Sequence, residues 1–324
     1  MNEATVVRER VRQKLYALCS FDACCIRTVD PNNLLTTGAL TDSDIEEIHP
    51  QLFVNEYLEG DIHSQEEMVV SGIPVKVLSS SIYVKKSKRL RMILQPAGFK
   101  DEMRIAFVTG DTCLGFASLY RRHLAFHLDE VKKIQKNIKN IVNILNEHLL
   151  TATHKAAPLA IQPMLIMSET FTIMYQNDEA RKWIHQLCEE ESINNNQLPR
   201  SIRSISYRLL KEHQQYTKIM MRDSIGFLYA LEASRLTDYD GKTVIVIKKS
   251  PMSHEDWFLY LTKCYKWTAK ESEIIRYLIK GDTTKEIAKQ LSISPYTVQD
   301  HLKSIFFKTD INTRSKLISM VNGN

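Results

Sequence analysis

The polar side chains best suited to chemistry lie near the C-terminus, in the segment PYTVQDHLKSIFFK at residues 295–308. Four of them have the spacing i, i+3, i+4 and i+7 and would share one helical face: Tyr296, Gln299, Asp300 and Lys303. Gln can bond adenine bidentately, Asp can accept from cytosine, and Lys can donate to guanine or phosphate. Val298, Leu302 and Ile305 form a second, apolar face. The segment is therefore predicted to be a helix that packs on one side and contacts nucleic acid on the other.

Capping patterns divide residues 267–321 into short helices. Two capping boxes, each a Thr followed by a Glu three residues later, are predicted at Thr268 and Thr283. Ser294 is expected to cap a third helix with Pro295 in its first turn, where a missing N–H costs nothing. Two short helices joined by a tight turn, the second carrying the polar face, describe a helix-turn-helix.

The segment TAKESEIIRYLIKGDTTKEIAKQLSISPYTVQDHLKSIFFKTDINTRSKL resembles the LuxR-type (GerE-type) DNA-binding domain of bacterial transcription regulators. The resemblance rests on T-x-x-E-x-E-I, then TKEIA-x-x-L-x-IS-x-x-TV-x-x-H, then T-R-x-x-L. It implies an all-α four-helix domain over residues 251–324, with a scaffold helix near Thr284–Leu291 and a recognition helix near Pro295–Lys308. The residues implied to bind DNA are Lys285, Ser294, Tyr296, Thr297, Gln299, Asp300, His301, Lys303, Lys308 and Arg314.

The resemblance also assigns roles within this set. Lys285, Thr297 and His301 would approach the DNA backbone, whereas Gln299, Asp300 and Lys303 would point into the major groove. Arg314 stands where the family often has a backbone contact or a structural pair. From Trp267 onward, nine basic and six acidic side chains give a net charge of +3. A single domain of this charge should bind weakly at physiological salt, so a homodimer on two half-sites is expected.

Three features depart from the family pattern. Asp310 stands where Gly is usual, but Asp tolerates a left-handed backbone, so the turn is expected to persist. Thr313 is followed three residues later by Lys316 rather than by an acid, which opposes the helix dipole. Phe307 stands where a polar residue is common. We expect it to pack against the last helix; an exposed contact for a partner is the alternative.

The first two-thirds of the chain combine helix and strand patterns and are expected to be α+β. Residues 1–152 resemble a GAF-like sensory domain through FDACCIRTVDPNNLL, FVNEYLEGDI, LQPAGFKDEMRIAFVTGDTCLGFASLYR and a closing helix from about Asp129. Residues 158–250 resemble a PAS-like fold through PMLIMSETFTIMYQNDEARKWI, IGFLYALEASRL and TVIVIKK. THKAAP at 153–158 is the expected linker between them. Both resemblances imply small-molecule binding or dimer formation, and neither identifies a ligand.

Other groups that could do chemistry are better explained as ordinary surface. His123 and His127 are four residues apart, but they lie between a strand and a helix, so a solvated pair is favoured over a metal site. Glu56, Asp61 and His63 could support acid–base chemistry, yet no nucleophile or oxyanion-type glycine loop accompanies them. A surface loop or a pocket rim is expected instead. We predict no catalytic residue, no metal and no cofactor.

Composition sets the remaining limits. The chain has 324 residues, a hydrophobic fraction of 44% and a net charge of +5, which suit two or three globular domains. No segment approaches the roughly 18 apolar residues of a membrane span, and the polar N-terminus does not resemble a signal peptide, so a cytoplasmic location is expected. The six cysteines are expected to be reduced and buried. The basic run Lys85–Arg91 is expected to be a solvated face.

These observations predict a bacterial DNA-binding transcription regulator that binds a pseudo-palindromic operator and is not an enzyme. Double-stranded DNA, a second copy of the chain and an unknown small-molecule or protein signal are the expected partners, with RNA polymerase as a further candidate. A sigma-like factor is one alternative, but it would need a basic, aromatic-rich promoter-melting helix upstream. An enzyme acting on a small signal molecule, with an appended helix-turn-helix, is the other; it lacks a coherent catalytic set.

Overall fold

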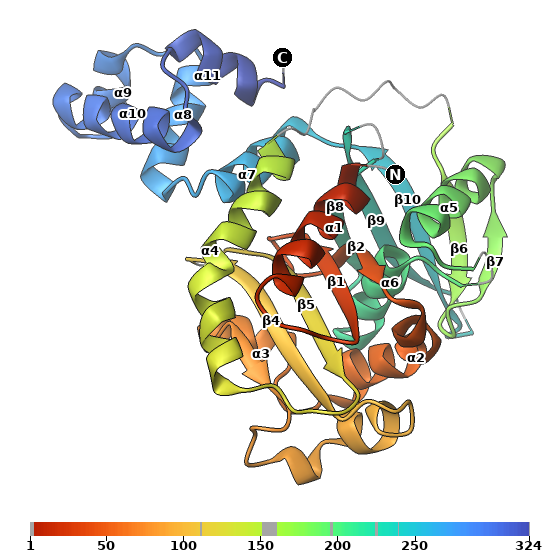
Figure 1. Ribbon diagram of the computed structural model, residues 1–324. Coiled ribbons are helices and arrows are strands. Elements are labelled where there is room, and N and C mark those ends of the chain that lie inside the picture. Colours follow the sequence, from red (N-terminus) through yellow and green to blue (C-terminus); the bar gives the residue numbers. More distant parts are fainter. Residues whose placement is uncertain are drawn as a thin grey trace.

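Figure 1 shows the computed structural model, which describes residues 3–110, 112–150, 161–194, 197–223, 226–238 and 240–323. Within these residues the chain forms two five-stranded antiparallel sheets followed by a run of helices. We refer to residues 3–150 as the first unit, 161–251 as the second unit and 254–321 as the helical domain. The linker expected at 153–158 lies outside the described residues.

The first unit is a sheet with helices on both faces. Its strands run antiparallel in the order β2-β1-β5-β4-β3. They are β1 (Ala23–Val29), β2 (Thr36–Thr41), β3 (Val75–Val77), β4 (Asp101–Thr109) and β5 (Thr112–Arg121). The helices are α1 (Glu3–Tyr16), α2 (Ser43–Val54), α3 (Gln65–Val70) and α4 (Leu128–Leu150), with short helical turns at η1 (Asn55–Glu59), η2 (Val84–Lys86) and η3 (Arg89–Leu94).

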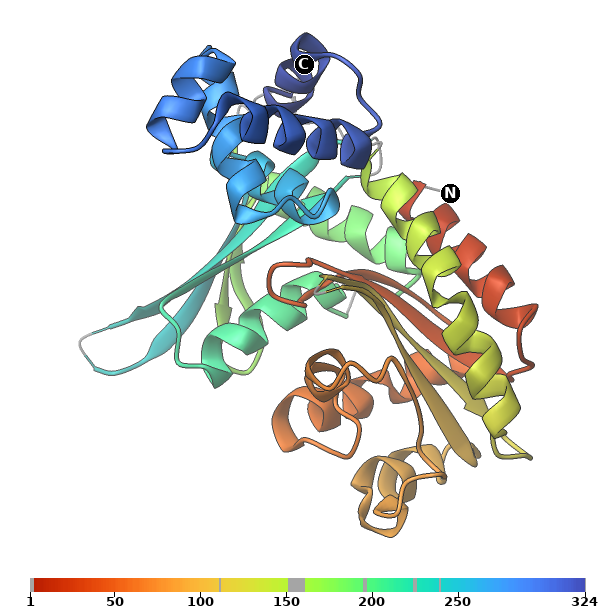
Figure 2. The same cartoon turned by 90° about the vertical axis from the view of Figure 1, so that its left-hand side faces the viewer.

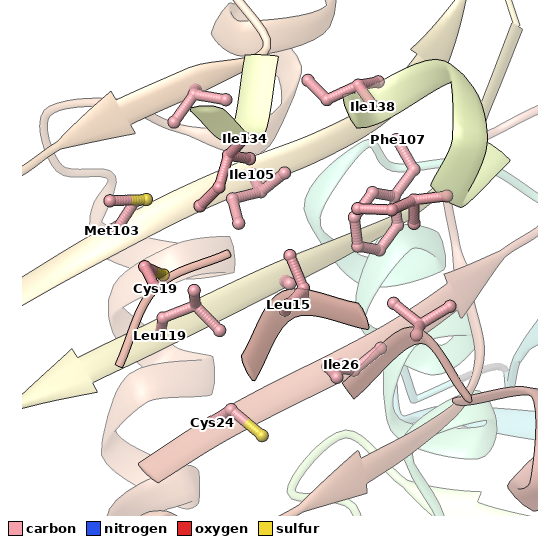
Figure 3. Packing of buried hydrophobic residues seen from close by; sticks show 14 of the residues in the cluster. Leu15, Cys19, Cys24, Ile26, Met103, Ile105, Phe107, Leu119, Ile134 and Ile138 are labelled. Atoms are coloured by element: carbon pink, nitrogen blue, oxygen red, sulfur yellow. The ribbon is translucent and has the colours of Figure 1, made fainter. Parts of the chain in front are cut away.

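Helices α1 and α4 cover one face of this sheet, and α2 and η3 contribute to the core on the other face. The closing helix expected from about Asp129 is thus confirmed as α4. Figure 3 shows how Leu15, Ile105 and Ile134 meet in the core under α1 and α4. The adjacent Cys24 and Cys25 belong to opposite cores because side chains alternate along a strand. All six cysteines are buried and unpaired, as expected.

The second unit has another sheet, with strands in the order β7-β6-β10-β9-β8. Its strands are β6 (Met164–Ser168), β7 (Ile173–Gln176), β8 (Tyr216–Arg222), β9 (Leu228–Thr237) and β10 (Thr243–Pro251), and its helices are α5 (Asp178–Glu191) and α6 (Arg200–Lys211). The segment PMLIMSETFTIMYQNDEARKWI forms the hairpin of β6 and β7 and the start of α5, and the strands β9 and β10 lie in IGFLYALEASRL and TVIVIKK. Helix α6 and strand β8 were not predicted from the sequence.

The two sheets share one topology. Counted from its own first strand, each runs in the order 2-1-5-4-3, with every neighbouring pair antiparallel. No sequence repeat indicates this shared topology. Hydrophobic patterning determines which face of a strand is buried, but it does not determine the individual residue types. The chain therefore contains two variants of one sheet arrangement in succession.

Helix α6 lies between the two sheets and joins the first unit to the second (Figures 1 and 2). Its buried Arg200 donates to Thr41 at 3.0 Å and also pairs with Glu46, both in the first unit. Deeper in the junction, the Met220 backbone N–H donates to the carboxylate of Asp30 at 2.8 Å. The two units are therefore packed together by direct polar contacts between their buried edges.

The helical domain follows β10 and lies at one end of the molecule (Figure 1). Its helices are α7 (His254–Cys264), α8 (Ala269–Ile279), α9 (Thr284–Gln290), α10 (Pro295–Thr309) and α11 (Arg314–Val321). The last four are the expected four-helix domain, and α7 is a further helix within residues 251–324 that was not predicted. Its core is continuous with the second unit, since Met220 and Leu228 belong to the same buried cluster as Trp257. No helix in the described part of the chain is long and apolar enough to cross a membrane.

Candidate nucleic-acid interface

Side-chain caps begin the successive helices of the helical domain. Thr268 accepts from the N–H of Glu271 at 3.2 Å, and the Glu271 carboxylate accepts from the N–H of Thr268 at 2.7 Å. The same reciprocal pair forms between Thr283 and Glu286. Both predicted capping boxes are confirmed. Each satisfies backbone donors that the first turn of a helix otherwise leaves open.

A tight turn sets the angle between α9 and α10. Ser292 adopts a left-handed conformation with φ 54°, and the N–H of Ile293 returns to the Ala288 carbonyl at 3.0 Å. The hydroxyl of Ser294 then accepts from the N–H of Thr297 at 3.0 Å and caps α10. This closes α9 and starts α10 within a few residues, so the two helices form the predicted helix-turn-helix.

Helix α10 separates its apolar and polar faces as expected. Val298, Leu302 and Ile305 are buried in the core of the helical domain. The predicted contact face points away from that core: Tyr296 is 80% exposed, and Gln299, Asp300 and Lys303 are also exposed. A helix that keeps large polar side chains in water on one face has that face available to a partner.

The charges on this face interact with one another. Lys303 Nζ lies 2.9 Å from the Asp300 carboxylate, one helical turn earlier. Both side chains are about three-quarters exposed, so the pair contributes little to stability. Because the pair is weakly held, either member can exchange its partner for a donor or acceptor on a base edge.

The residues expected near the DNA backbone flank this face. Lys285 is exposed in the first turn of α9. The hydroxyl of Thr297 lies 2.9 Å from that of Ser294, at the exposed N-terminus of α10. His301 is half-buried beside the same face. The N-terminus of α10 and the start of α9 thus present donors and a cation suited to phosphate.

Two predicted contact residues are instead bonded within the helical domain. Lys308 Nζ donates to the Glu271 carboxylate at 2.6 Å and to the Lys266 carbonyl at 3.0 Å. Arg314 donates to the Asp282 carbonyl at 2.8 Å, which is the structural pair that the family pattern allowed. Lys308 therefore joins α10 to α8, and Arg314 joins α11 to the turn before α9.

Glu271 is the central residue of this bonding, although its sequence pattern predicted only a capping role. Burial alone would raise its pKa, but hydrogen bonds from Lys308, from the Thr268 N–H and from Ser304 hold the pKa below its usual range. Lys308 lies 37 residues further along the chain. No local pattern connects residues so far apart, so only the packing of α8 against α10 reveals the pair.

The departures from the family pattern have mixed outcomes. Asp310 ends α10 with φ 53°, so the turn persists in a left-handed conformation as expected. Thr313 caps α11 by accepting from the N–H of Lys316 at 3.3 Å. The expectation that Phe307 packs against the last helix is wrong, because Phe307 is 90% exposed. It lies two residues beyond Ile305, which turns it far from the buried stripe of α10.

The charged and histidine side chains of the first unit lie partly in its core and partly on its surface. Arg89, in the basic run expected to be solvated, is buried and lies 2.6 Å from the Glu102 carboxylate, so that expectation is wrong for this residue. Glu56 pairs with Arg104. His123 and His127 are exposed just before α4. Within the described residues, no three His, Cys, Asp or Glu side chains form a group that could hold a metal ion.

An open cleft of about 870 Å³ lies between the first and second units. Glu56 and Asp61, expected at a pocket rim, belong to its lining, as do Tyr57 of η1 and Tyr207 of α6. The two tyrosine rings approach to 5.6 Å between centroids across the unit boundary. Residues of both signs line the cleft, so its charge does not select one class of ligand.

Comparison with known proteins identifies the C-terminal part. Residues 266–321 match the family described as bacterial regulatory proteins, luxR family. Over 52 residues, 16% of this chain, the sequence is 48% identical to the monoamine regulon transcriptional regulator of Klebsiella aerogenes and covers 23% of it. Over 51 residues, again 16% of this chain, it is 37% identical to the spore germination protein GerE of Bacillus subtilis (strain 168) and covers 69% of that protein.

The chain thus spans about a quarter of the length of the monoamine regulon regulator. Among solved structures, a Vibrio cholera VqmA–ligand–DNA complex aligns with 50% of this chain and 82% of its own, at 16% identity and a TM-score of 0.24. The predicted resemblance of the C-terminal segment is confirmed, and residues 266–321 are a LuxR-type helix-turn-helix domain.

Proposed function

We propose that the protein is a DNA-binding transcription regulator whose helical domain contacts a pseudo-palindromic operator. The observation that carries this proposal is the exposed polar face of α10, which takes no part in the core of the helical domain. The types on that face suit base edges, and the cap at Ser294 leaves the N-terminus of α10 open to a phosphate. The match to the luxR family over residues 266–321 supports the same function.

Within this proposal the predicted contacts divide into two groups. Gln299, Asp300 and Lys303 are the proposed base contacts. The proposed contacts to the DNA backbone and to the groove edge are Lys285, Ser294, Tyr296, Thr297 and His301. Lys308 and Arg314 are proposed to act by holding α10 and α11 in place, since both are bonded inside the helical domain.

The proposed division of the chain is a GAF-like domain at 1–152, a PAS-like domain at 158–250 and the DNA-binding domain at 251–324. The first two are proposed to receive a small-molecule or protein signal and to hold a homodimer. The sheet order 2-1-5-4-3 in both units and the cleft between them support a sensory role. The net charge of +3 after Trp267 supports the dimer, because one such domain would bind DNA weakly.

The test is genome-wide DNA selection with the full-length protein at two salt concentrations. Enrichment of one two-fold symmetric sequence is the expected result, and its affinity should fall as salt rises because phosphate contacts release counterions. Failure to enrich any sequence at either salt concentration would overturn the proposal.

Two substitutions then separate the proposed roles on the selected operator. Lys303→Ala should cost about 1–3 kcal/mol and relax specificity at one base pair. Lys285→Ala should weaken binding to all sequences alike and reduce the salt slope by about one. Lys270→Ala is the matched control, since Lys270 is a half-buried lysine on α8 that pairs with Glu273. Equal operator affinity for the Lys303→Ala and Lys270→Ala proteins would show that the recognition face is misplaced.

A further inference from the structure

One buried arginine of the first unit has no anionic partner. Five arginines in the described part of the chain are almost fully buried: Arg8, Arg89, Arg104, Arg121 and Arg200. The last four each form an ion pair with a glutamate. Arg8 of α1 is 5% exposed and forms no ion pair with any described residue. Among the described residues its side chain donates one hydrogen bond, from Nη2 to the Thr28 hydroxyl at 3.1 Å, and its buried Nε has no partner there.

This arrangement is costly for the protein on its own. Burial removes water from the guanidinium and lowers the pKa of Arg8 to about 10, although Glu191 and Glu190 act in the opposite direction from further away. Arg8 therefore still carries its charge at neutral pH. A buried charge is normally paired, because an unpaired one loses its hydration without compensation. An anion that bound at Arg8 would remove this cost.

The structure also provides space for such an anion. Arg8 lines a cavity of about 60 Å³ together with the hydroxyl-bearing Thr28 and Thr37, which are hydrogen-bonded to each other at 2.9 Å. A side chain at Gly38 would collide with the Arg8 guanidinium, so the glycine leaves room for it. At roughly 10–15 Å³ for each water-sized group, the cavity holds about four to six such groups.

The rest of the cavity is mainly apolar. This wall consists of Val29, Pro31, Leu114, Leu145, Met220, Leu228 and Tyr260. Asp30 and Arg222 also line the cavity. The Asp30 carboxylate already accepts from the N–H groups of Met220 and Asn32 and from the Asn32 side chain, so it is engaged in holding the two units together. The cavity is thus lined by the guanidinium of Arg8, which forms no ion pair with the described residues, and otherwise mainly by apolar side chains.

We infer that this cavity binds a short-chain aliphatic monocarboxylate, whose carboxylate pairs with Arg8 and whose alkyl chain lies against the apolar wall. A guanidinium can bond both oxygens of a carboxylate at once, and the apolar wall disfavours a fully hydrated inorganic anion. The size of the cavity limits the ligand to about four to six non-hydrogen atoms, the range from acetate to butyrate.

The position of the cavity gives the ligand a regulatory role, and this step rests on the proposed function. Its wall is built from the first unit, from β8 and β9 of the second unit, and from Tyr260 of α7. Helix α7 leads directly into the LuxR-type domain. A carboxylate bound at Arg8 would therefore stabilise one packing of α7 on the two units and so favour one placement of the DNA-binding domain.

The test is binding of acetate, propionate and butyrate to the full-length protein. Binding is measured by calorimetry and by the shift in unfolding temperature. Affinity should rise about fourfold with each added methylene group, because each one buries further apolar surface. Butyramide, which has the same shape without the charge, should not bind. A series in which butyrate binds no better than acetate, or in which butyramide binds as well as butyrate, would overturn the inference.

Arg8→Met tests the residue itself, with Arg10→Met as the control because Arg10 is exposed on the same helix. Arg8→Met should abolish butyrate binding and leave the unfolding temperature of the ligand-free protein unchanged or higher, since it removes an unpaired buried charge. A lower unfolding temperature with butyrate binding retained would show that Arg8 is only structural. If Arg8→Met fails to fold, the chain-length series and the butyramide comparison on the wild-type protein test the inference by themselves.

Operator binding by the ligand-free protein separates this inference from the proposed function. Arg8→Met should bind the operator as the wild-type protein does without butyrate, and only the response to butyrate should disappear. Loss of operator binding by the wild-type protein itself would refute the proposed function and would leave the calorimetric result for butyrate standing.

Discussion

The helical domain and the first unit are held together by contacts of different range. In the helical domain, Thr268, Thr283 and Ser294 each cap a helix by accepting from an N–H three residues later. In the first unit, the buried ion pairs join separate elements: Arg89 of η3 pairs with Glu102 of β4. Arg104 and Glu56 pair across 48 residues of chain. Local caps begin the helices of the first of these regions, which also has the long-range pair of Lys308 and Glu271, whereas several buried long-range ion pairs organise the second.

The difference predicts how each region responds to the loss of one side chain. A missing helix cap leaves backbone donors at an exposed helix end, where water replaces the lost acceptor, and this costs about 1 kcal/mol. A missing member of a buried ion pair leaves the other charge without water or partner, and this costs about 3–5 kcal/mol. Long-range charges should therefore make the first unit the more sensitive region.

Arg89→Met should have the largest effect of the changes considered. It leaves Glu102 buried, with a longer contact from Arg104 at 3.7 Å and a hydrogen bond from Ser118, and should lower the opening free energy of the first unit by about 3–5 kcal/mol. Hydrogen exchange of the β4 and β5 amides measures this directly, because the three tryptophans of the chain lie outside the first unit. Arg91→Met is the control, since Arg91 is exposed in the same turn. Similar exchange in the two variants would refute the importance of the buried pair.

Acid should affect the first unit next most strongly. Although burial opposes it, Arg89 and Arg104 lower the pKa of Glu102 from 4.5 to about 2. A carboxyl with a depressed folded-state pKa contributes stability that is complete above pH 4.5 and is lost as the pH falls toward 2. The first unit should lose about 2 kcal/mol between pH 5 and pH 3 from this group alone.

The same exchange measurement at pH 5, 4 and 3 checks this expectation. In the Arg89→Met protein the dependence on pH should be weaker, because the cation that lowers the Glu102 pKa is absent. An equal dependence in the wild-type and variant proteins would show that other carboxyl groups control the acid response.

The range of the contacts also explains what the sequence could predict. The caps at Thr268 and Thr283, the apolar stripe of α10 and its polar face were all predicted, because each depends on residues within one or two helical turns. The burial of Arg89 was not predicted, since its partner Glu102 lies on another element and nothing near Arg89 in the sequence indicates it. The same holds for Lys308 and its partner Glu271.

Two elements between the units were missed for a related reason. Helix α6 buries not only Ile202, Ile205 and Leu209 but also Arg200 and Ser204, so its buried face is partly polar. A pattern of apolar and polar residues does not reveal a face whose polar members are satisfied by another domain. Arg200 becomes interpretable only when Thr41 and Glu46 of the first unit are seen beside it.

Removal of one cap should produce a smaller, local effect. Thr283→Ala removes the acceptor for the Glu286 N–H and should destabilise α9 by about 1 kcal/mol. The effect should appear in exchange of the α9 amides and should leave β4 and β5 unchanged. Thr284→Ala is the matched control, because Thr284 is the first residue of α9 and does not cap it. Any change in the exchange rate of the β4 and β5 amides would show that the effect of this substitution is not confined to α9.

The smallest effect is expected at Asp310, where one backbone angle decides whether a substitution stabilises or destabilises the helical domain. Asp310 ends α10 at φ 53°, a conformation that costs an L-residue free energy and costs glycine almost none. Asp310→Gly should therefore stabilise the helical domain by about 0.5 kcal/mol after the greater entropy of glycine in the unfolded chain is counted. Asp310→Ala should destabilise it by a similar amount, because alanine lacks the short polar side chain that makes this conformation tolerable for Asp.

Thermal unfolding followed by tryptophan fluorescence can compare the two variants, since Trp257 and Trp267 lie in this core. Opposite signs for Gly and Ala would show that the conformation alone matters, whereas destabilisation by both would assign the Asp310 carboxylate a contact that sustains the turn.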